Sequence, residues 1–188
     1  MDLRRSGENE MRIIAGAYKG RNLKSPPSLN VRPTSDRLRE TLFNVIAPYI
    51  EDARFLDLCA GSGAVGIEAI SRGASHVTFV DRSRRMCKLI EANVQLCRIP
   101  EEQFVIYCSE ANEFLRQSKD ERWDIVFFDP PYKDDYLKTL QLLGNNALVI
   151  AEHHHKTELP EAIGGLERTR ILKQGDSSLS FYSTDEHG

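Results

Sequence analysis

The hydrophobic positions of the chain form short continuous runs that alternate with stretches of helical periodicity. Five apolar runs predict buried strands, at 54–59, 76–81, 104–109, 123–129 and 147–152. Four spans predict the helices between them, at about 63–72, 83–97, 111–118 and 134–143. Strands that are apolar throughout and separated by helices indicate a parallel sheet covered on both faces.

The two ends of the chain depart from this alternation. Turn residues alone join the strand-like runs 166–173 and 179–183, which predicts an antiparallel hairpin. Near the other end, 12–23 reads as a short hairpin with basic side chains, followed by a helix from about 36 to 47. The expected fold class is α/β, with a doubly wound, Rossmann-like seven-stranded sheet, a C-terminal antiparallel hairpin and a small basic N-terminal hairpin extension.

This pattern divides the chain into three parts. Residues 1–10 are polar and patternless, which predicts a disordered tail. Residues 11–53 form the N-terminal extension, and 54–188 form the main domain. The chain has 188 residues, enough for a full core. Its sequence has neither an apolar run near the ~20 residues of a membrane span nor a secretory apolar region.

Cysteine usage and charge narrow the class of protein further. The four cysteines lack CxxC spacing and lie in apolar patterns, so we expect buried, reduced thiols in a cytoplasmic protein without a metal centre. We also expect the protein to be a monomer. Consecutive histidines at 153–155 should point to alternate sides of a strand end. Residues 11–40 hold seven Lys and Arg against two Asp and Glu, a local charge of +5 in a chain of net charge −3. A basic arm on an acidic body suggests that a polyanion docks there.

The stretch 57–66 (DLCAGSGAVG) is the first candidate for chemistry. A strand leads into it and a helix follows, so its glycines let the backbone approach a ligand at a helix N-terminus. Asp81 ends the next strand, 20 residues after Gly61, which is the spacing of an acid that binds a ribose hydroxyl. NAD and S-adenosylmethionine both present such a ribose, so this motif leaves both cofactors open.

A second motif favours the methyl donor. Asp129, Pro130, Pro131 and Tyr132 follow the fourth strand, which neighbours the first in a doubly wound sheet. An exocyclic amine of a nucleobase is a poor nucleophile, because its lone pair is delocalised into the ring. The Asp129 carboxylate and the Pro130 carbonyl can accept its N–H bonds and aim the lone pair, while Tyr132 stacks on the base.

These motifs resemble the Asp/Asn-Pro-Pro-Tyr/Phe amino-methyltransferases of class I. The chain more closely resembles the bacterial 16S rRNA guanine-N2 methyltransferases of the RsmD type over about 11–183. The segments that carry the resemblance are 12–16 (RIIAG), 19–21 (KGR), 32–34 (RPT) and 37–44 (RLRETLFN). The resemblance implies S-adenosylmethionine as cofactor and 16S rRNA, within a small-subunit assembly particle, as partner.

The resemblance also implies roles for particular residues. The cofactor would be bound by Thr34, Arg39, Thr41, Phe43, Asp57, Ala60, Gly61, Gly63, Asp81, Arg82, Glu110, Ala111 and Asp129. The target guanine would be held by Asp129, Pro130, Pro131 and Tyr132, and rRNA phosphates would contact Arg12, Lys19, Arg21 and Arg32.

Three alternative functions stay open at this point. An adenine-N6 DNA methyltransferase shares the Pro-Pro-Tyr chemistry, but the sequence shows no target-recognition domain. A nicotinamide-dependent reductase would have no need of Asp129. A non-catalytic RNA-binding module would bind RNA without regard to S-adenosylmethionine.

Overall fold

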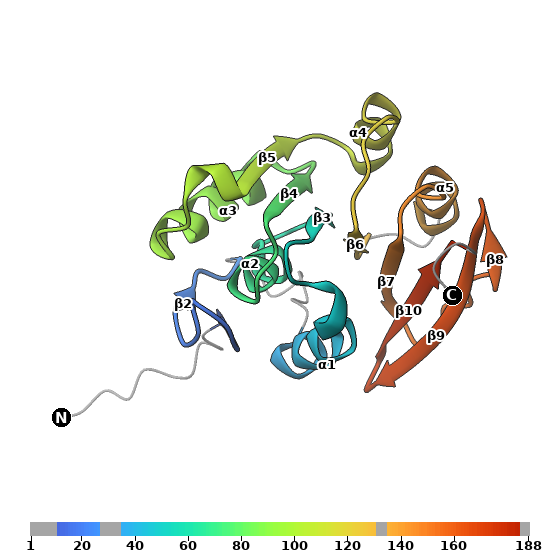
Figure 1. The fold of residues 1–188 in the computed structure, drawn as a ribbon, viewed down its shortest axis with the longest axis horizontal. Coiled ribbons are helices and arrows are strands. Elements are labelled where there is room, and N and C mark those ends of the chain that lie inside the picture. Colours follow the sequence, from blue (N-terminus) through green and yellow to red (C-terminus); the bar gives the residue numbers. More distant parts are fainter. Residues whose placement is uncertain (1–10, 27–34, 131–134, 185–188) are drawn as a thin grey trace.

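The computed structural model describes residues 11–26, 35–130 and 135–184, which form one large sheet, flanking helices and a small N-terminal hairpin (Figure 1). Five strands run parallel: β3 (Arg54–Leu58), β4 (His76–Asp81), β5 (Phe104–Cys108), β6 (Ile125–Phe128) and β7 (Leu148–His154). Three antiparallel strands follow: β8 (Ala162–Ile163), β9 (Leu166–Gln174) and β10 (Ser177–Ser183). The spatial order is β5-β4-β3-β6-β7-β10-β9-β8.

The helices cover both faces of this sheet, as the apolar pattern predicted. They are α1 (Asp36–Ile46), α2 (Ala64–Ser71), α3 (Arg84–Leu96), α4 (Ala111–Gln117) and α5 (Asp135–Leu142), with 3-10 turns at Ala47–Tyr49 and Glu101–Gln103. Alternate residues of one strand enter different cores. Phe55 joins the core beneath α1, α2 and α3, whereas Leu56 joins the core beneath α4 and α5.

The predicted fold class is confirmed, with one strand more than expected. The two-residue β8 pairs with the outer edge of β9 through Ala162↔Glu167 and Ile163↔Leu166. So short a run has no detectable alternation, which is why the sequence predicted seven strands. The N-cap Ser35 accepts a hydrogen bond from the Leu38 N–H at 3.2 Å, so α1 begins where its capping residue predicts.

The N-terminal hairpin consists of β1 (Met11–Arg12) and β2 (Asn22–Leu23), and it docks on α2. Glu68 of α2 has an exposed fraction of 0%, and its carboxylate accepts from the N–H groups of Ile14 at 2.8 Å and Ala15 at 3.0 Å. Arg72 donates to the same carboxylate at 2.8 Å. The hairpin is therefore fixed to the helix that begins at the glycine loop.

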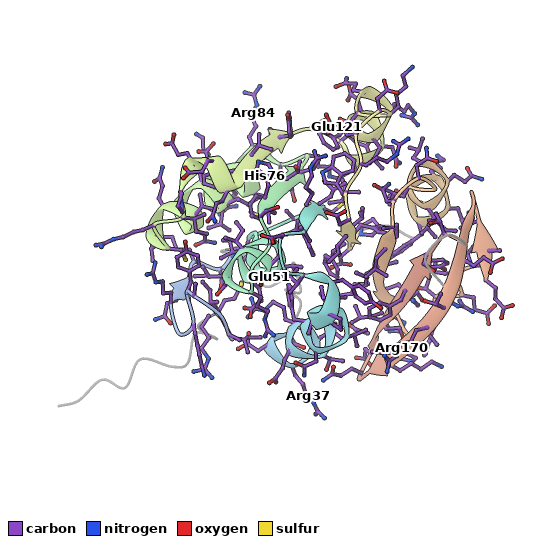
Figure 2. All side chains as sticks on the ribbon, viewed as in Figure 1. Arg37, Glu51, His76, Arg84, Glu121 and Arg170 are labelled. Atoms are coloured by element: carbon purple, nitrogen blue, oxygen red, sulfur yellow. The ribbon has the colours of Figure 1, made fainter. Side chains whose placement is uncertain are left out.

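Charged side chains cover the outside of the molecule, among them Arg37 on α1, Arg84 on α3 and Arg170 on β9 (Figure 2). None of the described helices is long and apolar enough to cross a membrane. The tail 1–10, predicted to be disordered, lies outside the described residues.

Candidate cofactor and target-base site

The glycine loop turns sharply between β3 and α2. Cys59, Gly61 and Gly63 have φ values of 59°, 57° and 78°, all in the left-handed region. The Gly63 N–H donates to the Ala60 carbonyl at 2.8 Å and closes the turn. A Cβ on Gly61 would meet nothing within 4 Å, so this backbone borders open space that a ligand can enter. At Gly66 a Cβ would lie 2.3 Å from the Phe79 ring, so this third glycine serves helix–sheet packing.

Two carboxylates hold the loop in place. Asp57 has an exposed fraction of 2% and accepts from the Gly66 N–H at 2.9 Å. Burial raises the pKa of Asp57 well above its ordinary value, and the charge of Asp81 raises it further. Asp81 accepts from the Gly61 N–H and the Ser83 N–H, each at 2.9 Å, so it links the loop to the start of α3. Its ribose-binding role stays a prediction, and lone pairs on both oxygens remain for such a contact.

The second motif lies beside the first, because β6 pairs with β3 through Leu58↔Phe128. Asp129 therefore follows the neighbouring strand, and Pro130 is buried next to it. Burial raises the pKa of Asp129 well above the ordinary carboxyl range, and the charges of Glu152 and then Asp57 raise it further. Pro131 and Tyr132 lie outside the described residues.

Four carboxyl groups lie near enough to Cys59, at the meeting point of the two loops, for their charges to act on its thiol. Burial raises the pKa of the Cys59 thiol first, and the charges of four carboxylates raise it further: Asp81, Asp129, Asp57 and Glu110. This acidic cluster suits a ligand with positive charge, such as a sulfonium or an ammonium group. It disfavours an anionic pyrophosphate, which argues against the nicotinamide alternative that the glycine motif left open.

Arg82 follows β4 and Glu110 follows β5, and both side chains are exposed. The Glu110 carboxylate accepts from the Glu113 N–H at 3.0 Å and so caps α4, the helix that Ala111 begins. Glu110 therefore has a structural role as a helix cap, in addition to the proposed contact with the cofactor. Contacts of these three residues with a cofactor stay predictions.

The predicted cofactor residues of the N-terminal extension are mostly engaged in packing. Arg39 has an exposed fraction of 0% and donates to the Arg12 carbonyl at 2.6 Å and the Asp36 carboxylate at 2.8 Å. Phe43 is buried against Phe55, with ring centroids 6.5 Å apart. Thr41 donates to the Gln174 side chain at 3.0 Å. Thr34 lies outside the described residues, and the cofactor roles of all four stay predictions.

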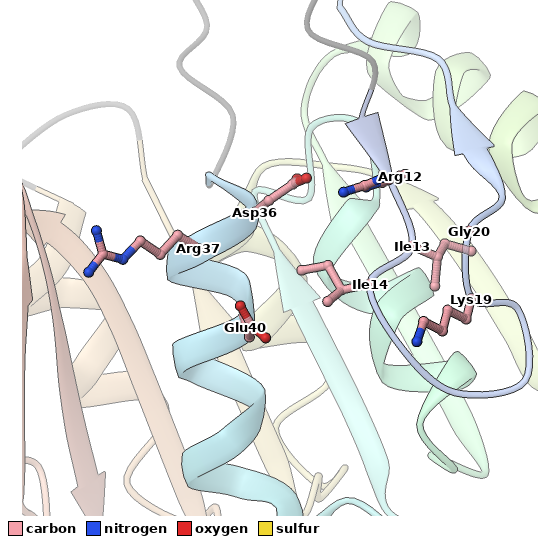
Figure 3. Close-up of a pocket in the computed structure, with 8 residues that line it drawn as sticks. All are labelled: Arg12, Ile13, Ile14, Lys19, Gly20, Asp36, Arg37 and Glu40. Carbon is pink, nitrogen blue, oxygen red and sulfur yellow. The ribbon is translucent and has the colours of Figure 1, made fainter.

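The predicted RNA-contact residues differ in how far the rest of the protein holds their side chains. Arg12 and Lys19 are exposed and line a cavity of about 460 Å³ between the hairpin and α1, together with Asp36, Arg37 and Glu40 (Figure 3). Arg21 is also exposed, but its guanidinium donates to the Cys97 carbonyl and lies over the Tyr18 ring at 4.8 Å. Arg32 lies outside the described residues.

Sequence reasoning missed Glu152 and Tyr136 as part of this site. Glu152 is buried at the carboxyl end of β7, and its charge reaches Asp129 on the neighbouring strand. The Tyr136 hydroxyl donates to the Glu152 carbonyl at 2.7 Å. The signal was present in the sequence, because the apolar run 147–152 ends in an acid as the second and fourth runs do.

Two local expectations need correction. His154 and His155 do not point apart: their ring centroids are 4.4 Å apart, because β7 ends at His154 and the chain turns. With Asp176 they form a cluster whose ligand atoms lie within 4.8 Å, although His154 Nδ1 already accepts from the Lys156 N–H. Cys108 is exposed rather than buried.

Comparisons with known proteins extend over almost the whole chain. The family described as Conserved hypothetical protein 95 matches residues 11–183. The chain is 37% identical over 190 residues to Ribosomal RNA small subunit methyltransferase D of Escherichia coli (strain K12), covering 97% of this chain and 94% of that protein. It is 40% identical over 185 residues to the Haemophilus influenzae protein of the same name, covering 94% of each.

Solved structures agree with this relationship. The structure of yhhF from Escherichia coli has a TM-score of 0.81 and 34% identity, covering 93% of this chain and 98% of that chain. Magnesium protoporphyrin IX methyltransferase from Synechocystis PCC 6803, solved with bound S-adenosylmethionine, has a TM-score of 0.61 at 13% identity, covering 78% and 79%. This second likeness concerns the fold alone.

Proposed function

The chain belongs to the family of the ribosomal RNA small subunit methyltransferases D, and from this premise we propose that it methylates the exocyclic N2 of a guanine in 16S rRNA. Membership carries the coarser statement, that the chain is an S-adenosylmethionine-dependent rRNA methyltransferase. The choice of guanine N2 is supported by the motif resemblance and by the chemistry of the Asp129 loop.

The observation that carries the proposal is the acidic cluster around Cys59, where the glycine loop and the Asp129 loop meet. Asp57, Asp81 and Asp129 converge on Cys59 there, and the backbone at Gly61 is open to a ligand. S-adenosylmethionine, when bound, supplies a methyl group on a positively charged sulfonium. The carboxylates stabilise that cation and the ammonium of its methionine part, so the residues present fit this cofactor.

Asp129 is the residue that we assign to the target amine. Its carboxylate accepts an N–H of the amine, and the Pro130 carbonyl accepts the other, which directs the lone pair away from both. Tyr132 stacks on the base, and Pro131 stiffens the loop. Because burial raises the pKa of Asp129, this group is also suited to take the proton that the amine loses after transfer.

The other site residues keep the roles that the resemblance implies. Cofactor binding is assigned to Thr34, Arg39, Thr41, Phe43, Ala60, Gly63, Arg82, Glu110 and Ala111 alongside the three aspartates above. RNA phosphates are assigned to Arg12, Lys19, Arg21 and Arg32, with Arg12 and Lys19 best placed because they line the cavity beside α1. The substrate is proposed to be a small-subunit assembly particle that a cytoplasmic monomer modifies.

The test compares two aspartates at opposite ends of one strand. The wild type, Asp129→Asn and Asp124→Asn are incubated with labelled S-adenosylmethionine and immature small subunits, and the labelled nucleotide is mapped. At saturating S-adenosylmethionine we expect Asp129→Asn to lose about 100-fold in single-turnover rate, because it loses a charged acceptor at the reacting amine. Asp124 is exposed and accepts from the Arg54 N–H at 2.8 Å, so Asp124→Asn should transfer at the wild-type rate.

Two results would contradict the proposal. Wild-type transfer by Asp129→Asn would remove Asp129 from the reaction. Label on an atom other than guanine N2, or on duplex DNA in preference to rRNA, would refute the assigned substrate.

A further inference from the structure

One buried side chain, that of Asn93 on α3, joins the N-terminal hairpin to the glycine loop. Its exposed fraction is 0%. Its Oδ1 accepts from the Lys24 N–H at 2.8 Å, and its Nδ2 donates to the Lys24 carbonyl at 3.1 Å and to the Ser62 carbonyl at 2.9 Å. The amide thus binds main-chain groups of two segments that lie 31 and 69 residues away in the sequence.

Ser62 is the point at which this bridge reaches the glycine loop. The turn closed by the Gly63 N–H and the Ala60 carbonyl contains the Ser62–Gly63 peptide, and Gly63 caps α2 with φ of 78°. A peptide next to glycine can change orientation at little cost. The bond from Asn93 to the Ser62 carbonyl therefore fixes the orientation of this peptide, and with it the Gly63 N–H.

Further contacts make the hairpin a rigid part of the same unit. The Ser62 hydroxyl donates to Met11 Sδ at 3.4 Å. On the other side of the hairpin, the Ala17 N–H donates to the Ser71 carbonyl at 2.7 Å, and a Cβ on Gly16 would lie 1.7 Å from that oxygen. A displacement of the hairpin by a ligand is therefore transmitted to both ends of α2.

We propose that Asn93 is a positioning residue that couples RNA binding on the hairpin to cofactor binding at the glycine loop. The inference rests on the proposed function, because it takes RNA and S-adenosylmethionine as the two ligands. RNA held by Arg12 and Lys19 favours the docked hairpin, and the docked hairpin favours the ordered Ser62–Gly63 peptide. Linkage requires the effect to be reciprocal, so the cofactor strengthens RNA binding by the same factor.

The test measures the dissociation constant of S-adenosylhomocysteine, which cannot donate a methyl group, with and without saturating immature small subunits that carry unmethylated 16S rRNA. In the wild type we expect RNA to tighten this binding about 5- to 10-fold. In Asn93→Ala we expect weaker binding of S-adenosylhomocysteine and almost no further tightening when RNA is added. Asn112→Ala is the matched control: Asn112 is also buried, but it accepts from Thr139 at 2.9 Å between α4 and α5, so this variant should keep the wild-type tightening.

A second pair of variants covers the case in which Asn93→Ala does not fold. Lys24→Pro removes the backbone N–H that donates to Asn93 Oδ1. The preceding residue, Leu23, lies in β2, and extended backbone is the conformation that a residue before proline prefers. Lys24→Ala removes the charge but keeps the N–H. We expect the coupling to be lost in Lys24→Pro and retained in Lys24→Ala.

Coupling that is absent from the wild type, or intact in Asn93→Ala or Lys24→Pro, would overturn the inference. If the wild type nonetheless transfers methyl groups to rRNA, the proposed function survives that result. If the wild type neither binds S-adenosylhomocysteine nor transfers a methyl group, the proposed function itself fails.

Discussion

The buried carboxyl group of Asp57 lowers the stability of the fold at neutral pH. Its raised pKa means that the native state binds a proton more tightly than the unfolded chain does. Its contribution to stability is therefore greatest below the ordinary carboxyl pKa of about 3.9, and it is lost as the pH rises from there through the native value. At neutral pH Asp57 therefore lowers the stability of the folded protein. We propose that its role in binding a cationic ligand accounts for its presence.

The variant Asp57→Asn is predicted to be more stable than the wild type and to bind the cofactor less well. The amide oxygen still accepts from the Gly66 N–H, but no buried charge has to be maintained. The stability advantage should grow with pH, by about 1.4 kcal/mol for each unit of raised pKa that is titrated. Urea unfolding at pH 5 and pH 8 measures it, and an advantage that shrinks with pH would contradict this account.

Asp129 leads to a prediction about rate rather than stability. If its carboxylate must be ionised to accept the amine N–H, the single-turnover rate should fall on acidification at a pH above the ordinary carboxyl range. Glu152→Gln removes the neighbouring charge that raises this pKa most, so activity should persist to lower pH. Rate–pH profiles of the two proteins measure the shift. An acid limb that stays in place, or moves to higher pH, would show that Glu152 does not act on Asp129.

Individual side chains were the hardest feature to predict from the sequence. The motif residues Asp57, Asp81 and Asp129 could be found because acids at strand ends are unusual in apolar runs. Arg39 and Phe43 were singled out only by the family resemblance, and the structure buries them in hydrogen bonds and ring contacts with residues elsewhere in the sequence. A local pattern cannot tell a residue that binds a ligand from one that holds the element presenting it.

At the level of elements, the N-terminal hairpin provides a matched pair of glycines. Gly16 and Gly20 have φ values of 84° and 82°, so alanine is strained at both. A Cβ would meet the Ser71 carbonyl at Gly16 but nothing within 4 Å at Gly20. We expect Gly16→Ala to lower the free energy of unfolding by about 3 kcal/mol or more and Gly20→Ala by about 1 kcal/mol.

Urea denaturation of the two variants separates backbone strain, which both variants have, from loss of hairpin packing against α2, which only Gly16→Ala should have. Equal losses would mean that the hairpin is not packed against α2. A larger loss at Gly16, together with faster amide exchange at Ile14 and Ala15, would show that the hairpin detaches from Glu68.

The elements themselves were predictable where several signals agreed. Ser35 and Ser83 cap α1 and α3 with their side chains, and the apolar periodicity agrees with both helices. The docking of the hairpin was not predictable, because it depends on Glu68, an acid in the middle of an apolar helix. Its partners are backbone N–H groups 53 and 54 residues away, which no sequence pattern marks.

At the scale of the whole molecule, the meeting of the two loops was predictable, but the gathering of acidic groups around Cys59 was not. Topology alone places the ends of β3 and β6 side by side. Asp81 at the end of β4 and Glu110 at the start of α4 also act on the Cys59 thiol. Their approach to it depends on the twist of the sheet and on burial, which the sequence does not show. The acidic cluster around Cys59 and the basic hairpin thus belong to one chain, and its net charge of −3 reveals neither of them.

The basic hairpin leads to the last prediction, which concerns how the whole charge distribution acts on a polyanion. Arg12→Ala and Lys19→Ala should each weaken binding to 16S rRNA and reduce the slope of log K against log salt concentration by about 0.7 to 0.9, because each removes one phosphate contact. Lys119→Ala, at an exposed position before β6, removes the same charge outside the hairpin and should leave the slope unchanged. Binding titrations at several salt concentrations measure these slopes. Equal slopes for all three variants would mean that net charge, and not the hairpin, sets RNA affinity.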